Sequence, residues 1–251
     1  MSFTTQPSTE RAIEPLVTSP LEPKAAPTVA PSRPRFLTLE PETDITVANS
    51  VVHLSLGKQL SPDRSPPLVT TLHGACWEAA PTCEALRDAL PSGFAMACPT
   101  GNAVCRGGGN DWVGDVDEKT AQLDSQVDAV RRELDSVGSA GSPNVIMGFS
   151  RGAFVARDVA LAHPGRYTAL VLIGAATSPD PEKLKLAGIR KVVLASGEYD
   201  SAAKTMQSAA VKLNARGLPA RYVSLGRVWH ALPPDSGKRL AAAIDWATQP
   251  Q

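Results

Sequence analysis

Residues 144–152 read Asn-Val-Ile-Met-Gly-Phe-Ser-Arg-Gly, and this stretch decides the fold of the chain. Its first residues form a short apolar run with β-branched side chains, which is typical of a strand buried on both faces of a parallel sheet. The stretch that follows, Ala153–His163, has the composition of a helix. The sequence therefore predicts a strand, a tight turn at Ser150 and a helix, in that order.

The predicted turn has the pattern Gly-x-Ser-x-Gly, with Gly148 and Gly152 on either side of Ser150. Between a strand and a helix, this pattern is typical of a nucleophile elbow, which holds a serine on a strained backbone. Residues two before and two after the serine pack closely, so a Cβ at either glycine would clash. The N–H groups that begin the helix favour negative charge there. We interpret Ser150 as a nucleophile, with a turn serine of no function as the alternative.

Outward from this stretch, strands alternate with helices. A half-exposed strand is predicted at residues 52–56, and Leu123, Val127 and Val130 have the spacing of one helix face. This alternation predicts an α/β fold with a mostly parallel central sheet and helices on both faces. The other buried strands are predicted at Leu68–Leu72, Phe94–Ala97, Val145–Met147, Ala169–Ile173, Val192–Ala195 and Arg221–Leu225.

Composition divides the 251-residue chain into two parts. Eight prolines fall within Met1–Pro41, and such a segment has little apolar surface to bury. We predict a proline-rich tail or linker over residues 1–35, either a tether or an end without a role, and one catalytic domain over residues 36–251. Twenty-five basic and twenty-five acidic residues balance, which argues against nucleic acid as a partner. No apolar run is long enough for a transmembrane helix.

A histidine and an acid follow the serine in the chain. Asp200 comes directly after the predicted strand Val192–Ala195, and His230 follows the next strand in a loop before the last helix. Because parallel strands end at one edge of a sheet, both residues are expected at the edge that carries Ser150. The order Ser, Asp, His is the one that accompanies a nucleophile elbow. Glu198 is a weaker candidate for the acid, Asp200 could also cap a helix, and His230 could be an ordinary loop histidine.

Leu72-His73-Gly74 ends an earlier strand, and with the elbow it resembles the α/β-hydrolase family, across most of residues 36–246. The likeness is to small esterases without a lid, of the carboxylesterase, dienelactone-hydrolase and polyester-depolymerase groups. It implies an oxyanion hole made by the backbone N–H groups of Ala75 (or Cys76) and Arg151. His73 would then hold the loop in place. Candidate substrate-binding residues, with plain packing as the alternative, are Trp77, Trp112, Phe149 and Trp229.

The linker between the elbow helix and the acid is short. After the strand Ala169–Ile173, only the 14 residues Thr177–Arg190 precede the next strand, and they include two prolines. A segment of this length can form a turn or one short helix. We therefore predict that no large lid covers Ser150 and that its groove is shallow and open.

Four cysteines lie in two pairs, Cys76 with Cys83 and Cys98 with Cys105, each seven residues apart. Neither spacing is that of a structural zinc site, and no metal is predicted. The simplest pairing joins the members of each pair into a local disulfide. Disulfides would indicate an oxidising compartment, so we expect an exported protein, periplasmic, secreted or surface-tethered; four reduced thiols in a cytoplasmic enzyme are the alternative.

The predicted function is hydrolysis of carboxylic esters through an acyl-enzyme on Ser150, with His230 as base and Asp200 orienting it. No cofactor is required. The expected partner is a small-molecule or polymeric ester, and the expected state is a monomer. The alternatives are a serine peptidase or amidase that uses the same triad, and a non-catalytic binding module of the same fold.

Overall fold

The computed structural model describes residues 1–2, 39–134 and 144–249. The chain divides into two units, and the second, Arg33–Gln251, contains all the elements below. From residue 3 onward, the tail predicted over residues 1–35 lies outside the described residues. No helix in the described ranges is long and apolar enough to cross a membrane.

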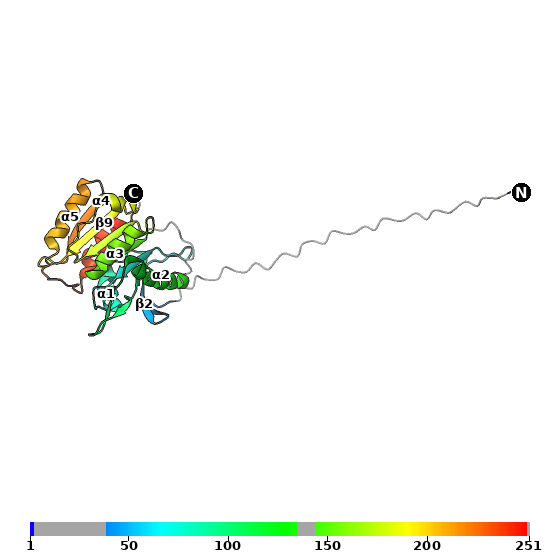
Figure 1. The fold of residues 1–251 in the computed structure, drawn as a ribbon, viewed down its shortest axis with the longest axis horizontal. Helices are drawn as coiled ribbons and strands as arrows, with labels where there is room; N and C mark the ends of the chain where they lie inside the picture. Colours follow the sequence, from blue (N-terminus) through cyan, green and yellow to red (C-terminus); the bar gives the residue numbers. More distant parts are fainter. Residues whose placement is uncertain (3–38, 135–143, 250–251) are drawn as a thin grey trace. The chain divides into compact units, whose positions relative to one another are not determined.

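One eight-stranded sheet forms the centre of the second unit (Figure 1). The strand order is β1-β2-β4-β3-β7-β8-β9-β10, and every neighbouring pair is parallel except β1–β2 and β2–β4. The mostly parallel sheet predicted from the sequence is confirmed. The strands are β1 (Glu42–Val47), β2 (Ser50–Leu56), β3 (Leu68–Leu72), β4 (Ala95–Cys98), β7 (Val145–Phe149), β8 (Ala169–Ile173), β9 (Lys191–Ser196) and β10 (Ala220–Ser224).

Helices cover both faces of the sheet. One apolar cluster joins the sheet to α2 (Val116–Glu133), α3 (Arg151–Ala162), α4 (Pro181–Leu186) and α5 (Ala203–Ala215). A second cluster joins the opposite face to α1 (Ala79–Leu86), the 3₁₀ turn η2 (Arg87–Ala89) and α6 (Ser236–Thr248). All five residues of β8 are buried, because a strand covered on both faces has no exposed side.

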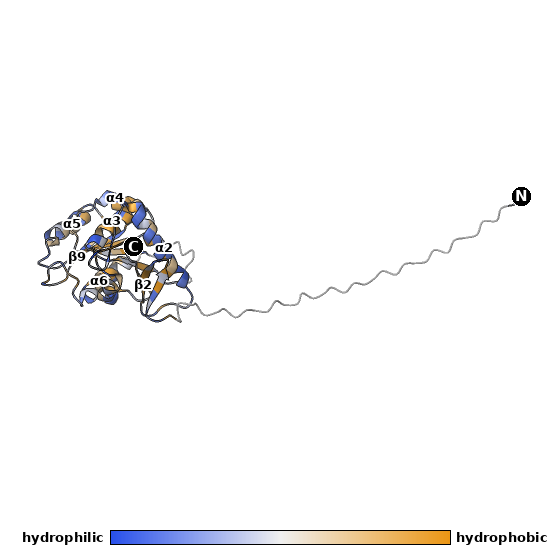
Figure 2. Cartoon of the chain, turned by 60° about the horizontal axis from the view of Figure 1, so that its bottom comes forward, coloured by the Kyte–Doolittle hydropathy of each residue, from blue (hydrophilic) through white to orange (hydrophobic). Residues whose placement is uncertain are grey.

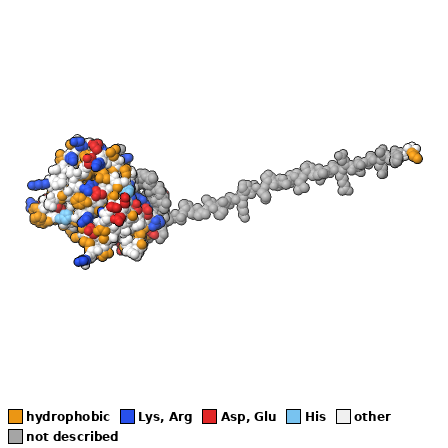
Figure 3. All heavy atoms as spheres, viewed as in Figure 1, with side chains coloured by type: hydrophobic (Ala, Val, Ile, Leu, Met, Phe, Trp, Pro, Cys, Tyr) orange, Lys and Arg blue, Asp and Glu red, His pale blue; other side chains and the backbone are white. Residues whose placement is uncertain are grey.

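Colouring by hydropathy shows the same arrangement. In Figure 2 the helices carry hydrophilic as well as hydrophobic residues. This mixture is expected of helices with one face on a sheet and one face in water. Figure 3 shows acidic, basic and apolar side chains interspersed on one face of the molecule.

Two features of the fold differ from the elements predicted from the sequence. The edge strand β1 is half-exposed, so its sequence Glu-Thr-Asp-Ile-Thr-Val lacks the apolar run of a buried strand. Between β4 and α2, a small hairpin forms from β5 (Ala103–Val104) and β6 (Asn110–Asp111). The strand β1 and the hairpin are stabilised more by backbone hydrogen bonds to a neighbouring strand than by burial of side chains. A hydropathy pattern does not indicate such backbone pairing.

The segment between β8 and β9 contains α4 alone, a helix of six residues. Asp180 caps it, since its carboxylate accepts hydrogen bonds from the backbone N–H groups of Glu182 and Lys183 at 2.9 and 3.0 Å. Residues 174–190 are all described, and they form no covering domain. The prediction of a fold without a large lid is confirmed.

The predicted local disulfides are wrong. The bonds that form are Cys83–Cys98, across 15 residues, and Cys76–Cys105, across 29 residues. Cys76 is not bonded to Cys83, its predicted local partner, but to Cys105, which lies in the β5–β6 hairpin loop. Separation along the chain did not decide the pairing because elements distant in sequence pack together.

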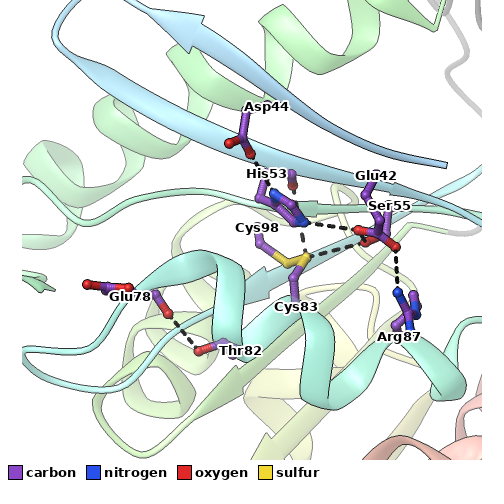
Figure 4. The surroundings of a disulfide bond; sticks show 9 residues. All are labelled: Glu42, Asp44, His53, Ser55, Glu78, Thr82, Cys83, Arg87 and Cys98. Carbon is purple, nitrogen blue, oxygen red and sulfur yellow. Dashed lines mark hydrogen bonds and ion pairs between the residues drawn. A yellow bond between two sulfur atoms is a disulfide. The ribbon is translucent and has the colours of Figure 1, made fainter. Parts of the chain in front are cut away.

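Figure 4 shows why Cys83 and Cys98 meet. Cys83 lies on α1 with no exposed surface, and α1 packs against β4, whose last residue is Cys98. Above the bond, Ser55 of β2 lies 3.8 Å from the sulfur of Cys83 and donates a hydrogen bond to Glu42 of β1 at 2.6 Å. The disulfide therefore joins α1 to the sheet from within the core.

The loop after β3 determines the other bond. Trp77 donates a backbone hydrogen bond to Asn110 at 3.2 Å and accepts one from it at 3.0 Å, so the loop runs beside the β5–β6 hairpin. Cys76 and Cys105 face each other across this contact, with 5.6 Å between their Cα atoms. Unlike Cys83, Cys76 is exposed.

Candidate active site

Ser150 stands at the turn between β7 and α3, as the sequence predicted. Its φ of 54° and ψ of −118° lie outside the regions that most residues adopt. Its backbone N–H donates to the carbonyl of Ile173 at the end of β8, at 2.8 Å. A strained backbone held by its neighbours is typical of functional positions.

The flanking glycines have the predicted steric role. A Cβ on Gly148 would lie 2.2 Å from the carbonyl oxygen of Gly152. A Cβ on Gly152 would lie 2.3 Å from the carbonyl oxygen of Leu72 at the end of β3. These contacts are with backbone, which cannot move aside, so the sharp turn needs glycine at both positions.

His230 and Asp200 lie in line with Ser150. The ring nitrogen Nε2 of His230 is 2.8 Å from Ser150 Oγ, and Nδ1 is 2.8 Å from Asp200 Oδ2. The side chain of Asp200 is only 2 % exposed, whereas that of His230 is 49 % exposed. The three groups therefore form one chain of hydrogen bonds from a buried carboxylate to a serine that water can reach.

The loops that carry the acid and the histidine are tied to each other. Glu198 N–H donates to Gly226 O at 2.8 Å, and Tyr199 N–H donates to Val228 O at 3.1 Å. A Cβ on Gly197 would lie 2.1 Å from Val228 O, so the two backbones are in contact. This contact fixes the distance between the residues that follow, Asp200 and His230.

Glu198, the alternative acid, faces elsewhere. Its carboxylate accepts a hydrogen bond from Ser224 Oγ at 3.1 Å and lies 3.9 Å from the guanidinium of Arg227. The second oxygen of Asp200, Oδ1, accepts from the N–H of Ala202 at 2.8 Å, in the turn before α5, so Asp200 is not the residue that caps this helix: the N-cap is Ala202. The regular helix α5 begins one residue later, at Ala203.

The turn after β3 lies against the serine. His73 has no exposed surface, and its Nε2 accepts a hydrogen bond from Gly101 N–H at 2.9 Å. Its Nδ1 must therefore carry the proton and donate to Gly74 O, at 2.7 Å. Burial lowers the pKa of His73, which favours this neutral ring.

The turn after β3 contacts the nucleophile at Gly74, the residue before Ala75. A Cβ on Gly74 would lie 3.4 Å from the Cβ of Ser150, so the loop passes in contact with the serine. On the other side, Arg151 is the first residue of α3. Its N–H is one of the helix-initial donors that have no partner within the helix.

For one of the four predicted substrate-binding residues, Trp112, the prediction is wrong. Its side chain is 1 % exposed and its Nε1–H donates to the carbonyl of His73 at 3.0 Å, so it packs beneath the loop and cannot wall an open groove. Phe149 is also buried and stacks on the ring of His230, with 5.1 Å between centroids. Trp77 and Trp229 are 50 % and 73 % exposed.

Two residues that were not predicted from the sequence, Gly174 and Gln126, position the site. Gly174 has a φ of 62°, and a Cβ there would lie 3.2 Å from His230 Cε1 and 3.4 Å from Asp200 Oδ2. Gln126 of α2, fully buried, holds the N–H and the carbonyl of Thr100, both at 2.8 Å, next to the Gly101 that contacts His73. For Gly174, its position directly after the strand β8 was a signal in the sequence. For Gln126, the sequence contains no such signal.

The described residues contain one group of side chains close enough to share a metal: Cys76, Cys105 and Asp111. The two sulfurs of that group are bonded to each other. They are therefore not thiolates, which are the form in which cysteine binds metals.

No protein-family profile and no curated protein matches the sequence. Among solved structures, the carboxylesterase from Mesorhizobium loti is 19 % identical and superposes with a TM-score of 0.57 over 84 % of this chain and 100 % of its own.

Two further structures are similar. Esterase PE8 is 22 % identical, with a TM-score of 0.56 over 76 % of this chain and 96 % of its own. FphF, a fluorophosphonate-binding serine hydrolase of Staphylococcus aureus, is 13 % identical, with a TM-score of 0.55 over 84 % of this chain and 100 % of its own. The strand order, the elbow between β7 and α3 and these likenesses agree: this chain has the α/β-hydrolase fold.

Proposed function

We propose that the protein is a serine hydrolase that cleaves carboxylic esters. One observation carries the proposal: Ser150, His230 and Asp200 are joined by two hydrogen bonds of 2.8 Å, with the serine on a strained turn. If Ser150 and His230 only packed in the structure, these hydrogen bonds would not be needed, because a serine and a half-exposed histidine can form hydrogen bonds with water. The fold shared with solved esterases adds support.

The first step is attack by Ser150 on the ester carbonyl. His230 Nε2 takes the proton from Oγ while the oxygen forms a bond to the carbonyl carbon. Asp200 accepts from Nδ1, which fixes the tautomer and stabilises the imidazolium. His230 then gives its proton to the departing alcohol oxygen, which leaves the acyl group bonded to Ser150 Oγ. In the second step water attacks the acyl carbon and gives its proton to His230. The bond to Oγ breaks, Oγ takes the proton from His230, and the carboxylic acid leaves.

The negative charge that develops on the carbonyl oxygen needs donors. The backbone N–H groups of Ala75 and Arg151 stand on the two segments that border Ser150, the loop after β3 and the start of α3. Each donor is expected to contribute about 3–4 kcal/mol to the transition state. His73 and Trp112 brace the first segment from beneath.

We further propose that the protein works in an oxidising compartment, as an exported protein. Both disulfides have normal Cα separations, 5.6 and 6.0 Å, and use all four cysteines of the chain. Disulfides persist in extracellular and periplasmic proteins and are rare in the cytosol.

A fluorophosphonate probe tests the activity directly. The wild-type protein should be labelled at Ser150, and S150A should not be labelled while keeping its far-UV circular dichroism and its Tm. Hydrolysis of short esters should fall by about 10⁵–10⁶ in kcat in S150A. If the wild type is not labelled, the protein is a non-catalytic binding module of the same fold. If it cleaves aminoacyl anilides faster than matched esters, it is a peptidase or amidase.

A further inference from the structure

Three aromatic side chains of the described residues are exposed, and all three follow strands of the central sheet. They are Trp77, Tyr199 and Trp229, with exposed fractions of 50 %, 48 % and 73 %. Each follows the carboxyl end of a strand: Trp77 after β3, Tyr199 after β9 and Trp229 after β10. Exposed aromatic rings gathered at one edge of a sheet indicate a surface that contacts a partner.

Tyr199 and Trp229 form a pair. Their ring centroids are 5.6 Å apart and the ring planes make an angle of 48°. The hydrogen bond from Tyr199 N–H to Val228 O and the contact between Gly197 and Val228 hold the two backbones together. The rings are therefore presented to water on a rigid support, which reduces the entropy lost when a ligand binds.

The place of the pair in the chain connects it to one half of an ester. Tyr199 directly precedes Asp200, and Trp229 directly precedes His230. In the proposed reaction His230 must hand a proton to the departing oxygen, so the alcohol half leaves on the side of the histidine. Because the pair is adjacent to Asp200 and His230 along the chain, we assign it to the alcohol half of the substrate rather than to the acyl half.

Two charged residues are close to the aromatic pair along the chain. Glu198 precedes Tyr199, and Arg227 lies two residues before Trp229; their side chains are 47 % and 83 % exposed and their charged atoms 3.9 Å apart. A purely apolar partner would desolvate these charges without replacing their hydrogen bonds, which is unfavourable. A sugar fits better, because its C–H face packs on aromatic rings while its hydroxyls bond to a carboxylate and a guanidinium.

We infer that Tyr199 and Trp229 form a subsite for a sugar ring, and that the substrate is an ester of a carbohydrate hydroxyl group. This inference rests on the proposed ester hydrolysis. It assigns the aromatic pair to binding the alcohol half, with Glu198 and Arg227 as hydrogen-bonding partners of the sugar.

The experiment keeps the acyl group constant and varies the alcohol. Acetylated cellobiose, acetylated xylobiose, phenyl acetate and ethyl acetate are compared for the wild type, W229A, Y199A and W229F, with V211A, an exposed apolar residue on α5, as the control. We expect W229A to lower the ratio of kcat/KM for a sugar acetate to that for ethyl acetate about tenfold, through KM. W229F should restore most of it, and V211A should leave both values unchanged.

Three outcomes would overturn the inference: an equal loss on all esters, which would mean that Trp229 only positions His230; no loss on any ester; or a loss confined to phenyl acetate. Binding of the two unacetylated disaccharides to S150A, followed by calorimetry, separates this inference from the proposed reaction. Binding that weakens in S150A/W229A supports the subsite even where no ester is cleaved. Absence of binding together with an unchanged ester ratio refutes the subsite while leaving the hydrolase intact.

Discussion

Asp200 faces His230 with one carboxylate oxygen, which lies 2.8 Å from the ring nitrogen Nδ1, and uses the other to hold the N–H of Ala202 at the start of α5. The carboxylate is thus fixed at both oxygens, and it is buried. The orientation of the histidine is therefore set by a group that cannot turn toward water.

This arrangement predicts that Asp200→Asn lowers kcat by about 10⁴, because an amide favours the wrong tautomer of His230. The matched control is Glu198→Gln, two residues earlier, which should keep most of the activity since Glu198 faces Ser224 and Arg227. Steady-state kinetics on one short ester compares the two. The reverse result would assign the acid to Glu198.

The elbow glycines allow a test of the close packing. Gly152→Ala would place a Cβ 2.3 Å from Leu72 O and 2.5 Å from His73 O, both backbone atoms. We expect the free energy of unfolding to fall by about 3–5 kcal/mol, or the protein not to fold. Gly107→Ala is the control, because a Cβ there meets nothing within 4 Å. Urea denaturation should show little change for the control, and similar values for both variants would contradict the described turn.

The two disulfides should respond differently to a reductant. Cys76 is exposed, whereas Cys83 and Cys98 have no exposed surface. A mild reductant is expected to open Cys76–Cys105 first, and opening it should lower kcat because Cys76 follows the proposed oxyanion donor Ala75. Alkylation and mass spectrometry identify the bond that opens. Removing this bond should also cost about 3–4 kcal/mol of stability in the chain-entropy view.

The lowered pKa of His73 leads us to expect that the folded protein loses stability in acid. Burial lowers its pKa in the folded protein below the ordinary 6.5, so the unfolded chain takes up a proton at a higher pH than the folded protein. Its contribution to stability is complete above about pH 6.5 and falls as the pH drops through the interval down to the folded pKa. In His73→Asn, unfolding free energies measured between pH 8 and pH 5 should decline less than in the wild type. Parallel curves would rule out this role.

The short segment between β8 and β9 predicts the choice of acyl chain. Only the six-residue helix α4 lies between β8 and β9, and the side chain of His230 is 49 % exposed. On p-nitrophenyl esters, kcat/KM should be highest for acyl chains of about two to six carbons, because the segment between β8 and β9 forms no lid that could enclose a longer one. No rise is expected when the ester concentration passes the micelle threshold. A preference for long chains with interfacial activation would contradict this expectation.

The sequence by itself determined the fold and the edge of the sheet at which Ser150, Asp200 and His230 meet. The reason is topological: in a parallel sheet of alternating strands and helices, each strand's carboxyl end lies at the same edge. A residue placed just after a strand is therefore near the others whatever the details of packing. The absence of a large lid was equally readable, since 14 residues cannot build one.

Only the tertiary structure decided what depends on distances across elements. The hydropathy pattern did not indicate that α1 packs Cys83 against Cys98, or that the loop of Cys76 pairs with the hairpin of Cys105. The burial of Trp112 beneath His73 was likewise unreadable, because a glycine-rich loop can place a tryptophan inside or outside. These contacts join residues on separate loops, and their partners are chosen by packing in space rather than by spacing along the chain.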